Sequence, residues 1–132
     1  MVNSVLSTDV GQCVVNVGWA VISITVMLKM MEDVMTSSVG LLVTLEAKPG
    51  KEAELADFLQ AARALVVEEP DSSTWYAFKI NSTQFGIYDT FPHEEGRQAH
   101  LSGKVATALG SRADELLASP PSIQPVEVLA FI

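Results

Sequence analysis

The sequence has little cysteine and little positive charge. The first shortage excludes an internal disulfide, and the second disfavours binding to nucleic acid. Cys13 is the single cysteine among 132 residues, so no internal disulfide can form and the fold must rest on packing and hydrogen bonds. Nothing in this cysteine usage indicates an oxidising compartment, and we expect a cytoplasmic protein. Only 8 Lys and Arg stand against 16 Asp and Glu, and the resulting net charge of −8 disfavours nucleic acid as a partner.

Hydrophobic residues, by contrast, make up 48 % of the chain. That share is enough to build a core, and the length fits one domain of ordinary size. Disordered, collagen-like and disulfide-stapled proteins are therefore excluded. The sequence also has no internal repeat, no glycine-rich phosphate loop and no serine or cysteine nucleophile motif. These absences disfavour repeat proteins, phosphate-loop nucleotide-binding proteins and hydrolases with such a nucleophile.

Residues 13–28 (CVVNVGWAVISITVML) form an uncharged and mostly apolar run. The run is shorter than the roughly 20 apolar residues of a membrane-spanning helix, and no Lys or Arg precedes it as in a signal peptide. Several methionines follow, and the residues from Met35 look like the start of an ordinary domain. We therefore expect residues 1–38 to be an N-terminal extension, produced by a misassigned start or forming a poorly ordered arm. The alternatives are a membrane-associating segment anchored by residues 13–28, and an extra strand or helix packed on the domain.

From residue 39 onward the hydrophobic pattern predicts alternating strands and helices. Residues 40–47 are rich in branched aliphatic side chains and end before a Pro-Gly pair, as a strand does at a turn. Apolar residues spaced three and four apart predict an amphipathic helix over residues 51–69, which Pro70 ends. The remaining expected elements are a hairpin of strands at 74–80 and 84–91, a helix from Pro92 that ends or bends at Gly110, a further helical turn over 111–118, and a last strand at 123–131.

The order of these elements, strand-helix-strand-strand-helix-strand, is typical of an α+β ferredoxin-like fold with both helices on one face of an antiparallel sheet. In the second strand Tyr76 and Phe78 share one face, whereas Trp75 lies on the other. Both faces of the sheet thus carry large apolar groups, although the helices can cover only one of them. We expect a second copy of the chain to cover the other face, so residues 39–132 form a homodimer.

The residues FGIYDTFP at 85–92, followed by GRQAHL at 96–101, and the junction LEAKPGKE at 45–52 resemble the antibiotic biosynthesis monooxygenase family, whose members are small dimeric α/β barrels. The resemblance covers residues 39–131. It implies a monooxygenase that uses dioxygen to oxidise a quinol-like or polycyclic aromatic substrate, with no metal, flavin or haem as cofactor. This chemistry is feasible because a deprotonated hydroquinone can itself reduce dioxygen in a dry pocket that supplies a base and hydrogen-bond donors.

The resemblance also implies which residues form the site. His100 lies at the position of the family's helix histidine and is the expected catalytic base, with an unperturbed pKa of about 6.5 that suits proton transfer. The residues expected to line the substrate pocket between sheet and helices are Trp75, Tyr88, Phe91 and Phe78, of which Tyr88 can also offer a hydroxyl to a substrate oxygen. Packing is the alternative role for a lone helix histidine and for large aromatic residues.

Some related activities are disfavoured by what the sequence offers. The haem-degrading branch of the family needs an asparagine on its first strand, where this chain has Leu42, Val43 and Thr44. The same absence weakens the similarity to the actinorhodin-type monooxygenases. A metal site at His93 and His100 is disfavoured because seven residues span about 10 Å along a helix.

Two other kinds of function stay open beside the monooxygenase. One is a non-catalytic module that binds a small apolar molecule or only dimerises. The other is a cofactor-free isomerase or decarboxylase, in which His100 would act as a proton shuttle. Each of the three would use the same apolar pocket, so the sequence alone does not separate them.

Overall fold

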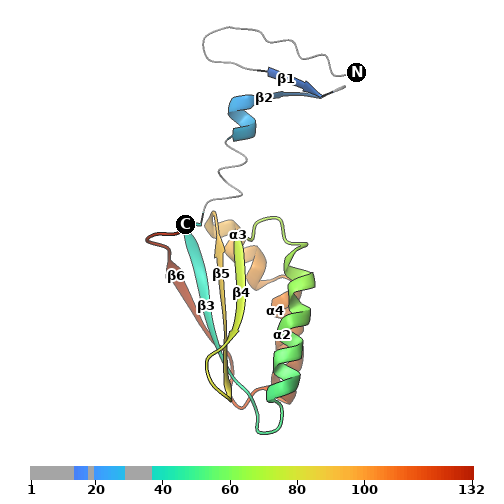
Figure 1. Cartoon of the computed structure of the whole chain (residues 1–132), viewed down its shortest axis with the longest axis vertical. Helices are drawn as coiled ribbons and strands as arrows, with labels where there is room; N and C mark the ends of the chain where they lie inside the picture. Colours follow the sequence, from blue (N-terminus) through green and yellow to red (C-terminus); the bar gives the residue numbers. More distant parts are fainter. Residues whose placement is uncertain (1–13, 18–19, 29–36) are drawn as a thin grey trace. The chain divides into compact units, whose positions relative to one another are not determined.

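The computed structural model describes residues 14–17, 20–28 and 37–132 of the chain, which divides into the units Met1–Met35 and Thr36–Ile132 (Figure 1). In the first unit β1 (Val14–Val17) pairs antiparallel with β2 (Ala20–Ser23), and residues 24–28 form a short helix. No helix among the described residues is long and apolar enough to span a membrane. Cys13 and the expected start near Met35 lie outside the described residues, and the role of residues 1–38 stays a prediction.

The second unit alternates strands and helices in the expected order. Its elements are β3 (Val39–Glu46), α2 (Glu52–Val66), β4 (Thr74–Lys79), β5 (Gln84–Phe91), α3 (Glu94–Leu101), α4 (Lys104–Leu116) and β6 (Ser122–Glu127). The strands lie in the order β4-β5-β3-β6, and each neighbouring pair is antiparallel. This arrangement confirms the expected α+β ferredoxin-like fold, because the first and third strands of the unit are the two central ones.

The second helical region is interrupted at a different residue from the one expected. Gly103, in an extended conformation with φ −84° and ψ −175°, separates α3 from α4. Gly110, the expected end or bend, lies inside α4 instead. The buried residues Val105 and Leu109 lie on the same side of α4 as the buried Leu116, so the apolar face continues past Gly110 and keeps that turn helical.

Two other boundaries also differ from the expected ones. α2 ends at Val66, before the expected residue 69. Pro70 has no N–H to bond the carbonyl of Val66, and the amide of Glu69 bonds to this carbonyl in a tighter turn instead. β6 ends at Glu127, four residues short of the expected end at residue 131.

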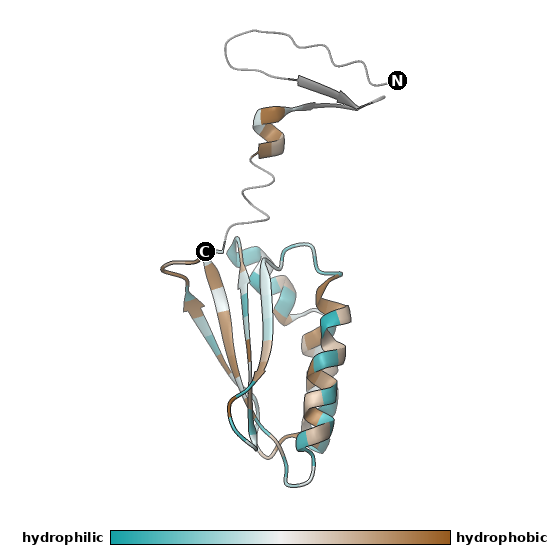
Figure 2. Ribbon diagram, in the orientation of Figure 1, coloured by the Kyte–Doolittle hydropathy of each residue, from teal (hydrophilic) through white to brown (hydrophobic). Residues whose placement is uncertain are grey.

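The core lies between the helices and one face of the sheet. Inward-facing residues alternate along β3 and β5, and Leu45, Phe85 and Ile87 are 0 %, 3 % and 4 % exposed. The helices contribute the buried leucines Leu55, Leu59, Leu109 and Leu116 to the same cluster. Each fully buried side chain of this size contributes about 1.5–3 kcal/mol, so this cluster holds the helices on the sheet. Figure 2 shows the matching alternation of hydrophobic and hydrophilic residues along α2.

The opposite face of the sheet also carries large apolar side chains. Tyr76 and Phe78 of β4 are 60 % and 39 % exposed, and the neighbouring Tyr88 of β5 is half-buried. The ring of Phe78 lies over Gly86, where an added Cβ would come within 2.4 Å of the ring. The face is therefore apolar, as expected, whereas the homodimer that would cover it stays a prediction.

Candidate functional site

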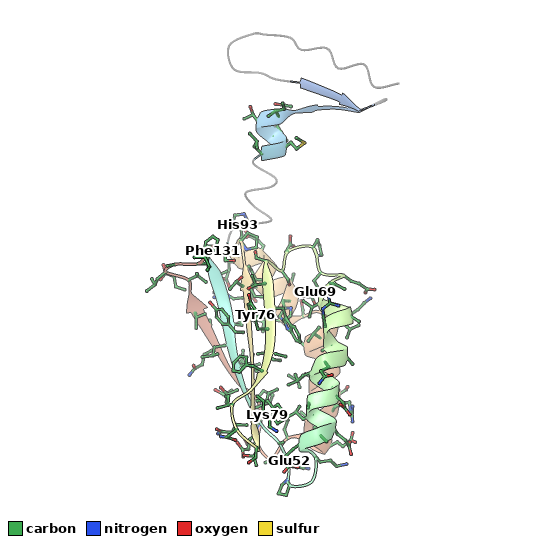
Figure 3. The ribbon with its side chains drawn as sticks, in the orientation of Figure 1. Glu52, Glu69, Tyr76, Lys79, His93 and Phe131 are labelled. Carbon is green, nitrogen blue, oxygen red and sulfur yellow. The ribbon has the colours of Figure 1, made fainter. Side chains whose placement is uncertain are left out.

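A histidine held between two carboxylates forms a buried polar cluster in the second unit. His100 of α3 is 8 % exposed, and its Nδ1 lies 2.5 Å from Oε2 of Glu69. Its Nε2 lies 2.8 Å from Oδ2 of Asp89, which is 1 % exposed. We call Asp89, His100 and Glu69 the trio. They come from β5, from α3 and from the connection between α2 and β4, where Figure 3 labels Glu69.

The local sequence explains how the two carboxylates reach His100. Asp89 belongs to the inward-facing row of β5, between Ile87 and Phe91, so its side chain points to the helices. Glu69 does not continue α2, because the following Pro70 disfavours the helical conformation at this residue. The hydroxyl of Ser72 then donates a hydrogen bond of 3.1 Å to Oε2 of Glu69, which fixes the carboxylate beside His100.

Two glycines allow α3 and the residue beyond it to approach the α2–β4 connection closely. Gly96 and His100 are four residues apart on α3, a spacing that puts them on one side of the helix, and Gly103 lies just beyond the end of α3. A Cβ at Gly96 would lie 2.9 Å from Cβ of Asp71, and a Cβ at Gly103 would lie 2.9 Å from Oε1 of Glu69. Larger side chains would push the connection away, so these glycines help to place Glu69 against His100.

The electrostatics of the trio keep His100 protonated at neutral pH. Burial lowers the pKa of the imidazole, but the hydrogen bonds and charges of Asp89 and Glu69 outweigh burial and raise the pKa of His100 to about 9. The sequence pattern did not reveal the two carboxylates, so it gave no reason to expect a pKa above the ordinary value of about 6.5.

Several polar atoms around the trio are buried without a hydrogen-bond partner among the described residues. They are Oε1 of Glu69, Nε1 of Trp75 and Oδ1 of Asp89, whose other carboxylate oxygen, Oδ2, pairs with His100. Trp75 and Asp89 are directly opposed on β4 and β5. Because such atoms are costly to bury, this combination of a donor with acceptors is typical of a site that receives a polar group.

A groove of about 650 Å³ between α2 and β4 reaches the trio at Glu69. Leu59, Val66 and Trp75 contribute apolar lining, while Ser72 and Glu69 contribute polar groups. A smaller cavity of about 290 Å³, lined in part by His100, shares Glu69 and Ser72 with the groove. The groove has the size and the mostly apolar lining of a small-molecule site, and an aromatic molecule would fit it.

The structure brings some of the predicted site residues together and separates others. His100, Trp75 and Phe91 lie on the helix side of the sheet, and the ring centroids of Phe91 and His100 are 5.3 Å apart. Phe91 is 0 % exposed, so it packs against His100 within the core. Tyr88 and Phe78 lie on the opposite face and do not join His100 in one pocket of this chain. Substrate contact by these two residues stays a prediction.

Sequence reasoning missed both carboxylates of the trio. Asp89 had a detectable signal, because it is the one charged residue in the otherwise apolar inward row of Phe85, Ile87 and Phe91. Glu69 had none, because it lies at the end of the helix predicted over residues 51–69 and looks like part of a solvated face, whereas its role depends on the packing of α3 against the α2–β4 connection. Among the described residues, no three His, Cys, Asp or Glu side chains are grouped in a way that could hold a metal ion.

Comparison with known proteins finds no matching family model and no matching curated protein, but it finds solved structures that are similar. A protein of unknown function from Nitrosomonas europaea is 48 % identical, with a TM-score of 0.73 over 74 % of this chain and 95 % of that chain. A candidate antibiotic biosynthesis monooxygenase from Nitrosomonas europaea is 14 % identical, with a TM-score of 0.64 over 70 % of this chain and 91 % of the other.

A second candidate antibiotic biosynthesis monooxygenase, from Caulobacter crescentus, is 16 % identical, with a TM-score of 0.62 over 76 % of this chain and 98 % of the other. At such low identity the two candidate monooxygenases show a common fold with this chain and nothing about its activity. The likeness to this fold family that the sequence indicated is thus confirmed.

Proposed function

The chain belongs to the same family as the Nitrosomonas europaea protein of unknown function, and we propose that it is a cofactor-independent monooxygenase that oxidises a quinol-like aromatic with dioxygen. The observation that carries this proposal is the buried trio at the end of a groove with an aromatic wall. The shared fold with candidate monooxygenases supports it. The substrate itself supplies the electrons, so the protein needs only to move a proton, hold an oxyanion and exclude water.

The trio supplies the base. The pKa of His100, about 9, is close to the pKa of a phenolic hydroxyl, about 10. Proton transfer between groups so closely matched is nearly balanced in energy, which favours general base catalysis. Glu69 lines the groove, so it receives the hydroxyl proton on behalf of the trio. The unpartnered Nε1 of Trp75 donates a hydrogen bond to the oxyanion that forms.

The oxidation then proceeds between the bound anion and dioxygen. The phenolate gives one electron to dioxygen, and the resulting phenoxyl radical and superoxide combine to form a C–O bond at a ring carbon that carries hydrogen. This carbon is para to the hydroxyl in a simple phenol and ortho to it in a hydroquinone. The trio returns its proton to the peroxide. Loss of the proton from the same carbon and cleavage of the O–O bond give a quinone and release the second oxygen atom as water. One phenol and one dioxygen thus yield one quinone and one water, and one hydroquinone and one dioxygen yield one hydroxyquinone and one water.

Oxygen uptake with a panel of hydroquinones and phenols tests this proposal. We expect the wild-type protein to consume dioxygen faster than the uncatalysed reaction, with one quinone formed per dioxygen. His100→Gln and Asp89→Asn should each lower the rate by about 100-fold, the usual contribution of general base catalysis. Arg112→Gln is the matched control, because Arg112 lies on α4 and pairs with Glu115 outside the groove.

Three results would contradict the monooxygenase. Equal rates in the wild type and in a folded His100→Gln variant would show that the trio is not the base. Binding of the aromatics without oxygen uptake would favour the binding module. An isomerised product or carbon dioxide, formed without oxygen uptake, would favour the isomerase or decarboxylase.

A further inference from the structure

Arg63 lies at the centre of the wall that α2 contributes to the groove. Its neighbours one helical turn away in both directions are Leu59, Gln60, Val66 and Val67, and all four line the groove together with it. Residues three and four apart share one side of a helix, so this side of α2 faces the groove. α2 and β4 lie side by side, which places Arg63 across from the strand that carries Trp75 (Figure 1).

The guanidinium of Arg63 has no acidic partner within the part of the chain that the structure describes. Arg97 pairs with Glu94, and Arg112 pairs with Glu54 and Glu115. The described lysines also have partners: Lys51 pairs with Glu54, Lys104 pairs with Glu68, Lys48 binds the carbonyl of Asp114, and Lys79 lies over the ring of Phe85. Arg63 is exposed, so its guanidinium is accessible to a ligand that enters the groove.

The surroundings of Arg63 explain why it stays unpaired. None of its four neighbours one turn away on α2 is charged, so no intrahelical ion pair can form. Glu69 is the single carboxylate of the groove lining, and it is already held by His100 and Ser72. The groove therefore offers one cationic group on its α2 wall, an aromatic wall at Trp75 and the base at Glu69.

We propose that Arg63 binds a carboxylate of the aromatic substrate, so that the substrate class is a ring carrying both a hydroxyl and a carboxylate group. This inference rests on the proposed function, since it takes the groove as the substrate site. A guanidinium matches a carboxylate through two parallel N–H bonds, which orients the ring as well as binding it. A single cation neutralises a monoanion but not a phosphate dianion, and in a protein of net charge −8 the monoanion is favoured.

The carboxylate and the hydroxyl would then be recognised at separate places. Arg63 holds the carboxylate, the ring lies against Trp75, and the hydroxyl reaches Glu69. This arrangement makes Arg63 a specificity-determining residue and leaves the proton transfer to the trio. Its loss should weaken binding of the acid selectively and leave binding of a neutral analogue unchanged.

Calorimetric titration of the full chain without oxygen tests the role of Arg63. The two ligands are 2,5-dihydroxybenzoate and its methyl ester, which share the hydroquinone ring and differ in the negative charge. We expect the wild type to bind the acid about tenfold more tightly than the ester, as a charge-assisted hydrogen bond in a partly open groove allows. Arg63→Gln should abolish this ratio without changing the affinity for the ester, and Arg63→Lys should retain part of it. Arg112→Gln serves as the charge-matched control and should leave the ratio unchanged.

Equal wild-type affinities for acid and ester would overturn the proposal, and so would the binding of neither ligand or an equal loss of both in Arg63→Gln. Because no dioxygen is present, the titration does not depend on turnover. An Arg63-dependent ratio without oxygen uptake in air would uphold the carboxylate site and refute the monooxygenase. Oxygen uptake with both the acid and the ester, bound with equal affinity, would uphold the monooxygenase and refute the carboxylate site.

Discussion

At the scale of single residues, the trio explains how a histidine can deprotonate a weakly acidic hydroxyl. An ordinary imidazole, with a pKa of about 6.5, is a poor base for a phenol. Asp89 and Glu69 raise the pKa of His100 to about 9, which makes its neutral form a much stronger base. The cost is that only a small fraction of the molecules is in the basic form at neutral pH.

This cost predicts the pH dependence of the reaction. The basic form requires loss of the His100 proton, so kcat/KM should rise by about tenfold for each pH unit below about 9 and level off above it. In Asp89→Asn one of the two carboxylates that raise the pKa is gone, so the midpoint of the profile should move to lower pH. Stopped-flow measurement of quinone formation between pH 6 and pH 10, corrected for autoxidation, gives the profile. A flat profile would show that the trio does not act as the base.

The sequence predicted part of this site for physical reasons that differ between the residues. His100 and Trp75 could be selected because their positions resemble those of a known family. Asp89 was detectable only through the alternation of β5, where it interrupts an apolar row. Glu69 and Arg63 could not be identified from the sequence. The ion pair of Glu69 with His100 and the position of Arg63 in the groove both depend on contacts between distant parts of the chain.

At the scale of elements, the order of strands and helices followed from apolar periodicity and from the prolines that end α2 and precede α3. The break between α3 and α4 did not, because Gly103 and Gly110 are equally suited to interrupt a helix. What selects Gly103 is tertiary packing, since the Oε1 atom of Glu69 occupies the space that a side chain there would need. At Gly110 an added Cβ would meet nothing within 4 Å.

This contrast gives a prediction for two glycine substitutions. Gly110→Ala fills open space inside an exposed part of α4 and should raise the free energy of unfolding by about 0.5–1 kcal/mol. Gly40→Ala places a Cβ 2.7 Å from the backbone oxygen of Asp89, so β3 and β5 must move apart. This substitution should lower the free energy of unfolding by about 1–3 kcal/mol. Urea unfolding followed by circular dichroism measures both. A destabilised Gly110→Ala protein would contradict the helical position assigned to this residue.

At the scale of the whole molecule, apolar surface gathers on the open face of the sheet and at the C-terminal end. Tyr76 is 60 % exposed, and Leu129 and Phe131 are 93 % and 55 % exposed. The sequence indicated this property, because both faces of its strands carry large side chains. We propose a homodimer that buries the open face through a two-fold interface, since exposed large apolar side chains on a sheet face are typical of an association site.

Sedimentation velocity of the full chain at micromolar concentration tests the homodimer. The wild type should sediment with twice the mass of one chain, and Tyr76→Glu should shift the protein to single chains, because the introduced charge would be buried without a partner. Ala53→Glu adds the same charge on an exposed position of α2, away from the sheet, and should remain dimeric. A wild-type protein that sediments as a single chain would refute the proposed interface.

Glu69 lies on a connecting segment, whereas Asp89 lies on a strand and His100 on a helix. The connecting segment can therefore change in sequence without altering the sheet or the helix that hold the other two residues. Proteins of this architecture that lengthen, shorten or neutralise the stretch before β4 would keep the groove yet lose the carboxylate that connects it to His100. We expect such homologues to bind an aromatic molecule without removing its hydroxyl proton. The composition of this short stretch therefore becomes a marker for sorting catalytic from binding members by inspection of their sequences.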